Sequence, residues 1–305
     1  MRWFRVVRRL LLVLALLLLL LAPGDREAVA PQATPELDVV VAVDRTTSMS
    51  ALDDPTGSRI TAVRRDLVEL GDQLGPSRFT VVTFGEAAAV RLPATSDRAS
   101  YRGEVESLQV ERADDGAGSS VGRAVPLLED LFARAEDALP ERLPVLVFVS
   151  DGENTSPDEQ ESFRALADQT LAAVVLGYGT AEGAPMPLDR VELDEAPPPA
   201  AAPGPVVTVP ETGEVALSRL DEGNLRLIAD ELDATYHPPG QDRSMAAVAA
   251  ELAERAYADL EPGRPERELR WLWALLVIAL ALPELRTGWR LWLHGRPRRR
   301  EAAHA

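Results

Sequence analysis

The residues from Leu37 to Ser50 have the pattern of a buried β-strand that ends in a cluster of side-chain oxygens. Five apolar residues, Val39 to Val43, are followed by Asp44, Thr46 and Ser48. An unbroken apolar run is typical of a strand that is covered on both faces. Such a strand needs no acidic, hydroxyl-rich ending, whereas a hard cation prefers these oxygens as ligands. The stretch therefore predicts a buried strand with part of a metal site at its carboxyl end.

Short apolar runs alternate with amphipathic segments from residue 37 to about residue 260. We expect strands in the runs LDVVVAVD, RFTVVTFG, AAAVRL, LPVLVFVSD and LAAVVLGYG, with a hairpin between the second and the third. We expect helices over residues 59–74, 97–108, 119–139, 157–170 and 222–232. This alternation predicts an α/β fold, in which a doubly wound and mostly parallel central sheet is flanked by helices. Ligands of such sheets bind beyond the carboxyl ends of the strands.

A proline- and alanine-rich stretch interrupts the alternation at residues 195–205. We expect an exposed loop with polyproline character there. A hairpin over residues 206–219, turning at Thr212-Gly213, should follow it. The whole α/β domain is then expected to span residues 31–262.

Charge is distributed unevenly along the 305 residues, whose formal net charge is −17. Residues 1–22 contain four arginines and no acidic residue, and residues 264–305 contain nine arginines and four acidic residues. The negative charge therefore lies in the middle of the chain. Basic ends around an acidic centre fit a membrane topology with cytoplasmic ends. They argue against a nucleic-acid partner, which requires concentrated positive charge.

The N-terminal apolar run, Leu10 to Ala22, spans roughly 20 Å as a helix, against the ~30 Å of a bilayer core. Residues 1–30 are expected to be a signal peptide or an uncleaved signal anchor. The triplet Ala28-Val29-Ala30 resembles a signal peptidase site, but Pro31 after it disfavours cleavage and so favours the anchor. Either segment sends the following domain across the membrane.

The C-terminal apolar run begins at Trp271 and predicts a transmembrane segment over residues 270–293. Arginines flank it, and three tryptophans near its ends are typical of an interface-anchored span. Pro283 and Glu284 shorten its apolar core, so an amphipathic or buried terminal helix stays an alternative. Residues 294–305 would form a basic cytoplasmic tail, and the acidic domain would face the outside of the cell membrane.

Three pieces of sequence are suited to complete the metal site. The first is Asp44 with Thr46 and Ser48, and the second is Ser119, in a hydroxyl-bearing loop that enters a helix. The third is Asp151, directly after a long apolar strand. Two carboxylates and three hydroxyls form an oxygen shell suited to Mg²⁺, Mn²⁺ or Ca²⁺, with one exchangeable position for an outside carboxylate. The chain has no cysteine and only three histidines, two of them in the tail, so we expect no thiolate or histidine-based zinc site.

These residues resemble the metal-ion-dependent adhesion site of the von Willebrand factor A (VWA) domain family. That site has the pattern D-x-S-x-S, a distant threonine and a later aspartate followed by glycine. Asp44, Ser48 and Asp151 match the pattern, whereas Thr46 and Ser119 replace a serine and a threonine and keep the hydroxyl group. We take Ser119 rather than Ser120, because SSVG resembles the family's T-x-I-G.

Further segments resemble the membrane-anchored bacterial Bat-type group (BatA/BatB-like) of this family. They are Asp53-Asp54-Pro55, Ser58-Arg59-Ile60, RFTVVTFGEAAAV from Arg78, Ser150 to Asn154, Gly177 to Thr180 and Ser218 to Asp221. The resemblance implies a non-catalytic domain that binds a divalent cation and a protein partner. It also implies a working relation with MoxR-type AAA ATPases and sister Bat-type proteins.

Three other interpretations remain open from the sequence. Asp44 and Ser48 could instead cap a following helix. A magnesium-dependent phosphotransferase of the haloacid dehalogenase type also has an aspartate motif after its first strand. Thr46 stands where that enzyme needs its acid/base aspartate, and the chain has no lysine to hold a phosphoryl group. The third interpretation is a structural anchor with a metal site that never fills.

Overall fold

The computed structural model describes Trp3 and residues 36–111, 120–138, 142–188, 205–209, 212–240 and 243–258. The chain divides into two units. One comprises Met1–Gln32 and Glu261–Ala305, and the other comprises Ala33–Leu260. Apart from Trp3, both expected membrane segments lie outside the described residues. Within the described part of the chain, no helix has the length and apolarity needed to cross a bilayer.

Six strands form the central sheet of the second unit, in the order β3-β2-β1-β4-β5-β8. Five of them run parallel, and β3 is an antiparallel edge strand. Their bounds are β1 Leu37–Asp44, β2 Ser77–Phe84, β3 Ala89–Thr95, β4 Leu143–Ser150, β5 Ala172–Gly177 and β8 Thr235–His237. The expected α/β class with a mostly parallel sheet is confirmed.

Strands β1 and β4 are direct neighbours, and their register decides what meets at the end of the sheet. Val43 lies opposite Val149, so Asp44 stands level with Ser150, and Asp151 follows at once. All eight residues of β1 are buried. The apolar residues thus place the strand between two layers of helices, and the polar residues lie where the strand leaves them.

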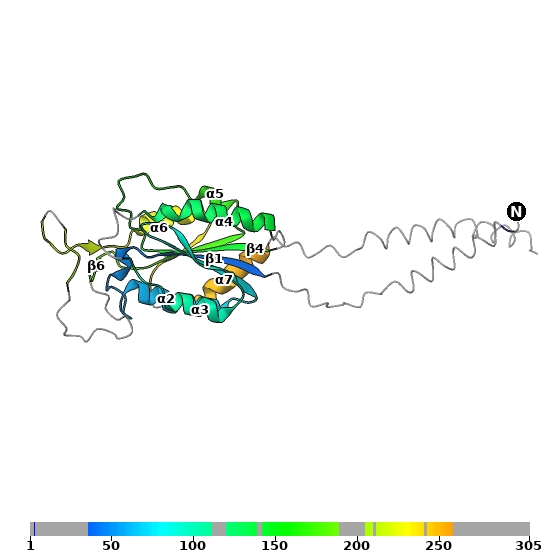
Figure 1. Ribbon diagram of the computed structural model, residues 1–305, viewed down its shortest axis with the longest axis horizontal. Coiled ribbons are helices and arrows are strands. Elements are labelled where there is room, and N and C mark those ends of the chain that lie inside the picture. Colours follow the sequence, from blue (N-terminus) through cyan, green and yellow to red (C-terminus); the bar gives the residue numbers. More distant parts are fainter. Residues whose placement is uncertain are drawn as a thin grey trace, which may run out of the picture. The chain divides into compact units, whose positions relative to one another are not determined.

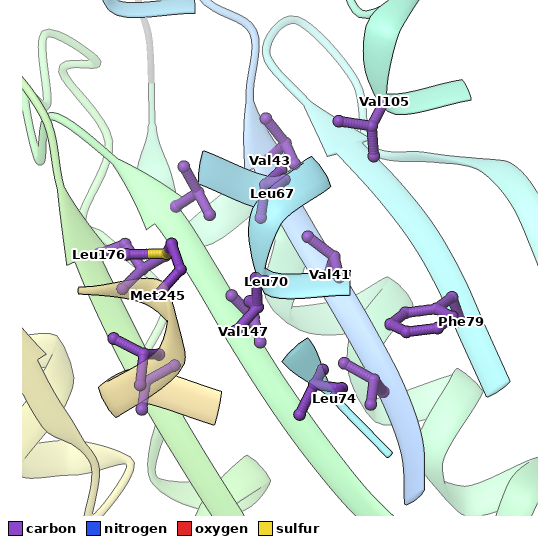
Figure 2. Packing of buried hydrophobic residues seen from close by; sticks show 14 of the residues in the cluster. Val41, Val43, Leu67, Leu70, Leu74, Phe79, Val105, Val147, Leu176 and Met245 are labelled. Carbon is purple, nitrogen blue, oxygen red and sulfur yellow. The ribbon is translucent and has the colours of Figure 1, made fainter. Parts of the chain in front are cut away.

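Helices cover both faces of the sheet (Figure 1). One face is covered by α2 Arg59–Gln73, α3 Arg98–Glu106 and α7 Met245–Ala258. The other carries the 3₁₀ turn η2 Val121–Ala124 together with α4 Val125–Ala138, α5 Arg164–Ala167 and α6 Glu222–Glu231. Helix α2 turns Ile60, Val63, Leu67 and Leu70 towards the sheet at helical spacing. Figure 2 shows Leu67 and Leu70 with the valines of β1 and β4 in this core.

One sequence prediction about a helix is wrong, and one helix was not predicted. The helix expected over residues 157–170 is reduced to the single turn α5, and α7 has no counterpart among the expected helices. Polar side chains take the backbone N–H groups before α5: Asn154 accepts from Ser156, Ser156 from Asp158, and Ser162 from Arg164. These local hydrogen bonds compete with helix formation.

A small antiparallel ribbon projects from the domain where the parallel strands end (Figure 1, β6). We call its described residues, 184–188, 205–209 and 212–218, the arm. Strand β6 Ala184–Pro185 pairs with β7 Leu217–Ser218, and isolated bridges join Pro187 to Val206 and Thr208 to Val215. The chain turns at Gly213, whose N–H donates to the carbonyl of Val209. The proline-rich residues 195–205 lie outside the described residues except for Pro205.

Candidate metal centre

Asp44 and Asp151 leave the sheet side by side, at the carboxyl ends of β1 and β4. Their relative exposures are 1% and 0%. Two carboxylates are thus buried at one sheet edge, where two charges are costly unless partners compensate for them. The prediction that these two strands are neighbours is confirmed.

Asp44 is surrounded by hydrogen-bond donors from its own loop and from β4. Its Oδ1 accepts from the backbone N–H of Thr46 at 2.9 Å and from the Thr46 hydroxyl at 2.7 Å. Its Oδ2 accepts from the Ser150 hydroxyl at 2.6 Å. Within the described residues, no arginine bonds to Asp44. The carboxylate is therefore held in place by neutral groups and has no counter-charge in contact.

The hydroxyls of Thr46 and Ser48 lie 2.7 Å apart, directly beside Asp44. They flank the start of the short 3₁₀ helix η1 Thr47–Ser50, which has no side-chain cap. The capping interpretation of Asp44 and Ser48 thus does not describe this loop. These side chains instead bond to one another and to Asp151, to which the Ser48 hydroxyl bonds.

Asp151 is held from both sides. The backbone N–H of Glu153 donates to its Oδ1 at 3.0 Å, and Nη1 of Arg59 donates to its Oδ2 at 2.7 Å. The next residue must be glycine, because Gly152 has φ +77° and a Cβ there would lie 2.5 Å from the carbonyl oxygen of Asp221. The D-G pair thus turns the chain sharply and leaves the carboxylate at the edge of the sheet.

Sequence reasoning missed the role of Arg59, which is fully buried. Its guanidinium forms a two-bond pair with Asp53 and also binds Asp151 and Ser218. One signal was present in the sequence. A basic residue begins α2, where the helix dipole disfavours positive charge, and no acidic residue stands in the first turn.

Ser119, the candidate ligand from the distant loop, lies outside the described residues. The described residues on either side are Glu111 and Ser120. The N–H of Glu111 donates at 2.7 Å to the carbonyl of Arg45, which lies between Asp44 and Thr46. Ser120 is buried and precedes η2 without forming a side-chain cap. The choice between Ser119 and Ser120 stays a prediction.

The pKa values of both carboxyl groups are raised by burial, but the neighbouring charges of the two groups differ. Burial, and next the charge of Asp151, raise the pKa of Asp44 to about 7. Burial also raises the pKa of Asp151, although the Arg59 charge and the Ser48 hydroxyl oppose that shift. Burial thus disfavours the charged form of both carboxyl groups, and of the two only Asp151 accepts a hydrogen bond from an arginine among the described residues.

These groups fit a divalent cation. The described residues contain no cluster of three or more histidine or acidic side chains that could hold a metal, so a site here depends on hydroxyls beside two carboxylates. Asp44, Ser48 and Asp151 supply oxygens of the type that Mg²⁺ and Mn²⁺ prefer. A cation would also supply the positive charge that Asp44 lacks.

Fold and site together define a class. Residues 39–153, a range that includes all five candidate ligands, match the family model for the von Willebrand factor type A domain. This part of the chain therefore matches a VWA domain, and the resemblance seen in its sequence is confirmed.

Two solved structures of Bacteroides proteins are similar to it. The conserved hypothetical protein BatB from Bacteroides thetaiotaomicron is 25% identical, with a TM-score of 0.57, and the match covers 72% of this chain and 98% of that one. An aerotolerance-related membrane protein from Bacteroides fragilis, carrying multiple mutations to serine, is 23% identical over 73% and 99% of the two chains, with a TM-score of 0.57.

A more distant structure is described with a metal. Proximal thread matrix protein 1 from the mussel byssus, with zinc in its MIDAS motif, is 12% identical, with a TM-score of 0.45 over 73% of this chain and 48% of that one. This similarity is too remote to carry an argument here. No curated protein matches the chain.

Proposed function

We propose that this protein is a membrane-tethered, non-catalytic interaction module that binds a divalent cation through Asp44, Thr46, Ser48, Ser119 and Asp151. One observation carries the proposal. Asp44 is buried beside a second carboxylate, and its partners among the described residues are the hydroxyls of Thr46 and Ser150 and one backbone N–H, with no arginine among them. Such an arrangement is costly by itself and is relieved by a metal ion.

The bound cation would give the domain its binding chemistry. Mg²⁺ keeps part of its coordination for water or for an outside ligand. A carboxylate from a partner protein would occupy that position, while Asp44 and the hydroxyls hold the ion. The chain's own residues would orient the site and exclude bulk water from its inner side, because Asp44 and Asp151 are almost fully buried.

The tether and the partners form the second part of the proposal. Residues 1–30 and 270–293 would hold domain 31–262 outside the cell membrane, with residues 294–305 in the cytoplasm. The Bacteroides fragilis relative is itself named a membrane protein. Sister Bat-type proteins, together with a MoxR-type ATPase acting from the cytoplasm, would be the partners. Protease protection of residues 31–262 in sealed cells or vesicles would test the orientation.

The direct test is calorimetric titration of the full chain, purified in detergent, with Mg²⁺ and with Mn²⁺. We expect one site per chain in the wild type and none in Asp44→Ala. A wild-type protein that binds neither ion contradicts the proposal. A matched pull-down from membranes, with and without EDTA, would then show which partners depend on the metal.

A further inference from the structure

We propose that Arg59 is a positioning residue of the metal site, which fixes the carboxylate of Asp151 and ties it to the base of the arm. The proposal rests on the proposed metal function and extends it from the ligands to the ribbon beside them. Arg59 has a relative exposure of 0%, an unusual place for a guanidinium. Its contacts explain why it is there.

The guanidinium uses all of its nitrogens. Nε and Nη2 donate to the two oxygens of Asp53 at 2.8 and 2.7 Å, and Nη1 donates to Asp151 Oδ2 at 2.7 Å. Ser218 accepts two more bonds, through its hydroxyl at 2.8 Å and its carbonyl at 3.1 Å. A planar fork can make these bonds at once, whereas the single ammonium of lysine cannot.

Asp53 decides how Arg59 acts on the metal. A lone guanidinium next to the site would repel a cation. The two-bond pair with Asp53 offsets this charge, and Arg59 together with its bonds to Asp53 keeps the pKa of that carboxyl below its usual value despite burial. With its charge offset, Arg59 acts on the site by orienting Asp151. Arg59 bonds to Oδ2 of this carboxylate, and the backbone N–H of Glu153 and the hydroxyl of Ser48 bond to it as well.

Asp53 and Arg59 also bond to the chain on both sides of the base of the arm. On the entering side, the N–H and the hydroxyl of Thr180 donate to Asp53 Oδ2 at 2.9 and 3.0 Å. On the leaving side, Ser218 accepts from Arg59 and donates its hydroxyl to Glu153 at 2.6 Å. The arm is therefore fastened to the residues that fix Asp151.

Backbone geometry at Gly179 makes room for this arrangement. Gly179 has φ +105°, and a Cβ there would lie 2.6 Å from the Arg59 guanidinium. The chain entering the arm thus passes directly over the buried cation. A shift of Asp151 on metal binding would reach the arm through one side chain. By linkage, a partner that orders the arm would also strengthen metal binding.

The experiment compares the full-length wild type with Arg59→Lys, which keeps the charge and loses the fork. We expect the Mn²⁺ dissociation constant to rise by about tenfold in Arg59→Lys, as for other residues that orient metal ligands. Hydrogen exchange supplies a second readout. Saturating Mn²⁺ should slow exchange at residues 180–183 and 216–221 of the wild type, and should leave these segments unchanged in Arg59→Lys.

Arg243→Lys is the matched control, because the side chain of Arg243 is only 7% exposed but bonds to Asp66 and the carbonyl of Gly177 instead of Asp151. It should lose stability and keep wild-type Mn²⁺ affinity. Ser218→Ala tests the connection between Arg59 and the base of the arm without removing a charge. It should speed exchange at the arm base and weaken Mn²⁺ binding by about threefold, a fraction of the cost of losing a positioning residue.

Two results would overturn the proposal. The first is unchanged Mn²⁺ affinity in both Arg59→Lys and Ser218→Ala. The second is an equal loss of affinity in Arg243→Lys, which would reduce Arg59 to general stability. A wild type that binds no metal is a different outcome, since it removes the proposed function itself.

Discussion

Two buried clusters of charged side chains lie in this domain, and they differ in one respect. Around Asp66, Arg243 donates at 2.6 Å and the Tyr178 hydroxyl at 2.9 Å to Oδ2, and Arg65 donates at 2.8 Å to Oδ1. Around Asp44, three hydrogen bonds come from neutral groups of Thr46 and Ser150. Arginines bond to the first carboxylate, whereas no arginine among the described residues bonds to the second.

The difference distinguishes a closed ion-pair cluster around Asp66 from the proposed metal site around Asp44. Both carboxylates are buried and both have hydrogen-bond donors, so neither burial nor hydrogen bonding tells them apart. The two carboxylates differ in whether an arginine balances their charge. The charge of Asp66 is balanced by two arginines that bond to it. One of them, Arg243, also stacks over the Tyr178 ring, 4.3 Å from its centroid. No cation among the described residues bonds to Asp44, which stands beside a second carboxylate, and this arrangement supports the proposed metal site.

The largest effect should come from breaking the balanced cluster. Arg243→Met leaves Asp66 buried without its closest cation and should lower the free energy of unfolding by about 3 kcal/mol, the scale for removing one partner of a buried pair. Urea denaturation with and without Mg²⁺ measures it. The loss should be the same in both conditions. A loss that Mg²⁺ reverses would mean that this cluster is also part of the metal site.

Asp44→Asn should have the opposite sign in metal-free protein. The amide can still accept from Thr46 and removes a charge that faces Asp151, so at pH 8 in EDTA we expect a gain of about 1 to 2 kcal/mol, equal to one pKa unit or slightly more. In Mg²⁺ the order reverses, because the wild type gains stability from the ion by mass action. Asp44→Asn less stable than wild type in EDTA would contradict the charge argument.

pH should act on the stability of the domain through the carboxyl group of Asp44. The pKa of Asp44 is about 7 in the folded protein, against 3.8 for an ordinary aspartate. Between these values the folded state holds a proton that the unfolded state has lost. The stability from this group is therefore complete below pH ~4 and is lost as pH rises to about 7.

Metal competes with that proton, so Mg²⁺ affinity should rise from pH 5.5 to about 7 and then level off. Calorimetry across this range, with EDTA-treated protein, measures the rise. Asp44→Asn should show a flatter dependence of metal-free stability on pH than the wild type. A Mg²⁺ affinity that does not change with pH would place the titrating proton elsewhere.

The smallest effect separates two adjacent hydroxyls. Ser119→Ala should weaken Mn²⁺ binding by about tenfold, or 1.4 kcal/mol, if it removes one oxygen ligand of several. Ser120→Ala is the matched control and should stay within about threefold of wild type, since Ser120 forms no side-chain cap in the structure. The reverse result would assign the ligand to Ser120.

Local patterns predicted the parts of the fold that depend on local chemistry. The apolar runs at 37–44 and 143–150 predicted β1 and β4, and their neighbouring carboxyl ends brought Asp44 and Asp151 together as expected. The segment 157–170 looked helical by spacing alone. The hydrogen bonds of Asn154, Ser156 and Ser162 to nearby backbone were not visible in that spacing, and α5 has one turn.

Arg59 shows why the rest of the site could not be predicted. Its partners Asp151 and Ser218 are 92 and 159 residues away along the chain. Only the folded topology brings them to one point, and the arginine within the S-R-I motif has no periodic signature. A positively charged residue at a helix start was the single local sign.

The edges of the sheet limit how a partner can approach this domain. Strand β3, on one side, is mostly exposed and contains Arg91 and Pro93, and β8, on the other, has three residues followed by Pro238 and Pro239. Charge, proline and short length all hinder the addition of a further strand. The sheet therefore resists growth through its backbone at both sides. The proposed recognition would then use side chains and a cation at the ends of the strands, where specificity can change without disturbing the fold.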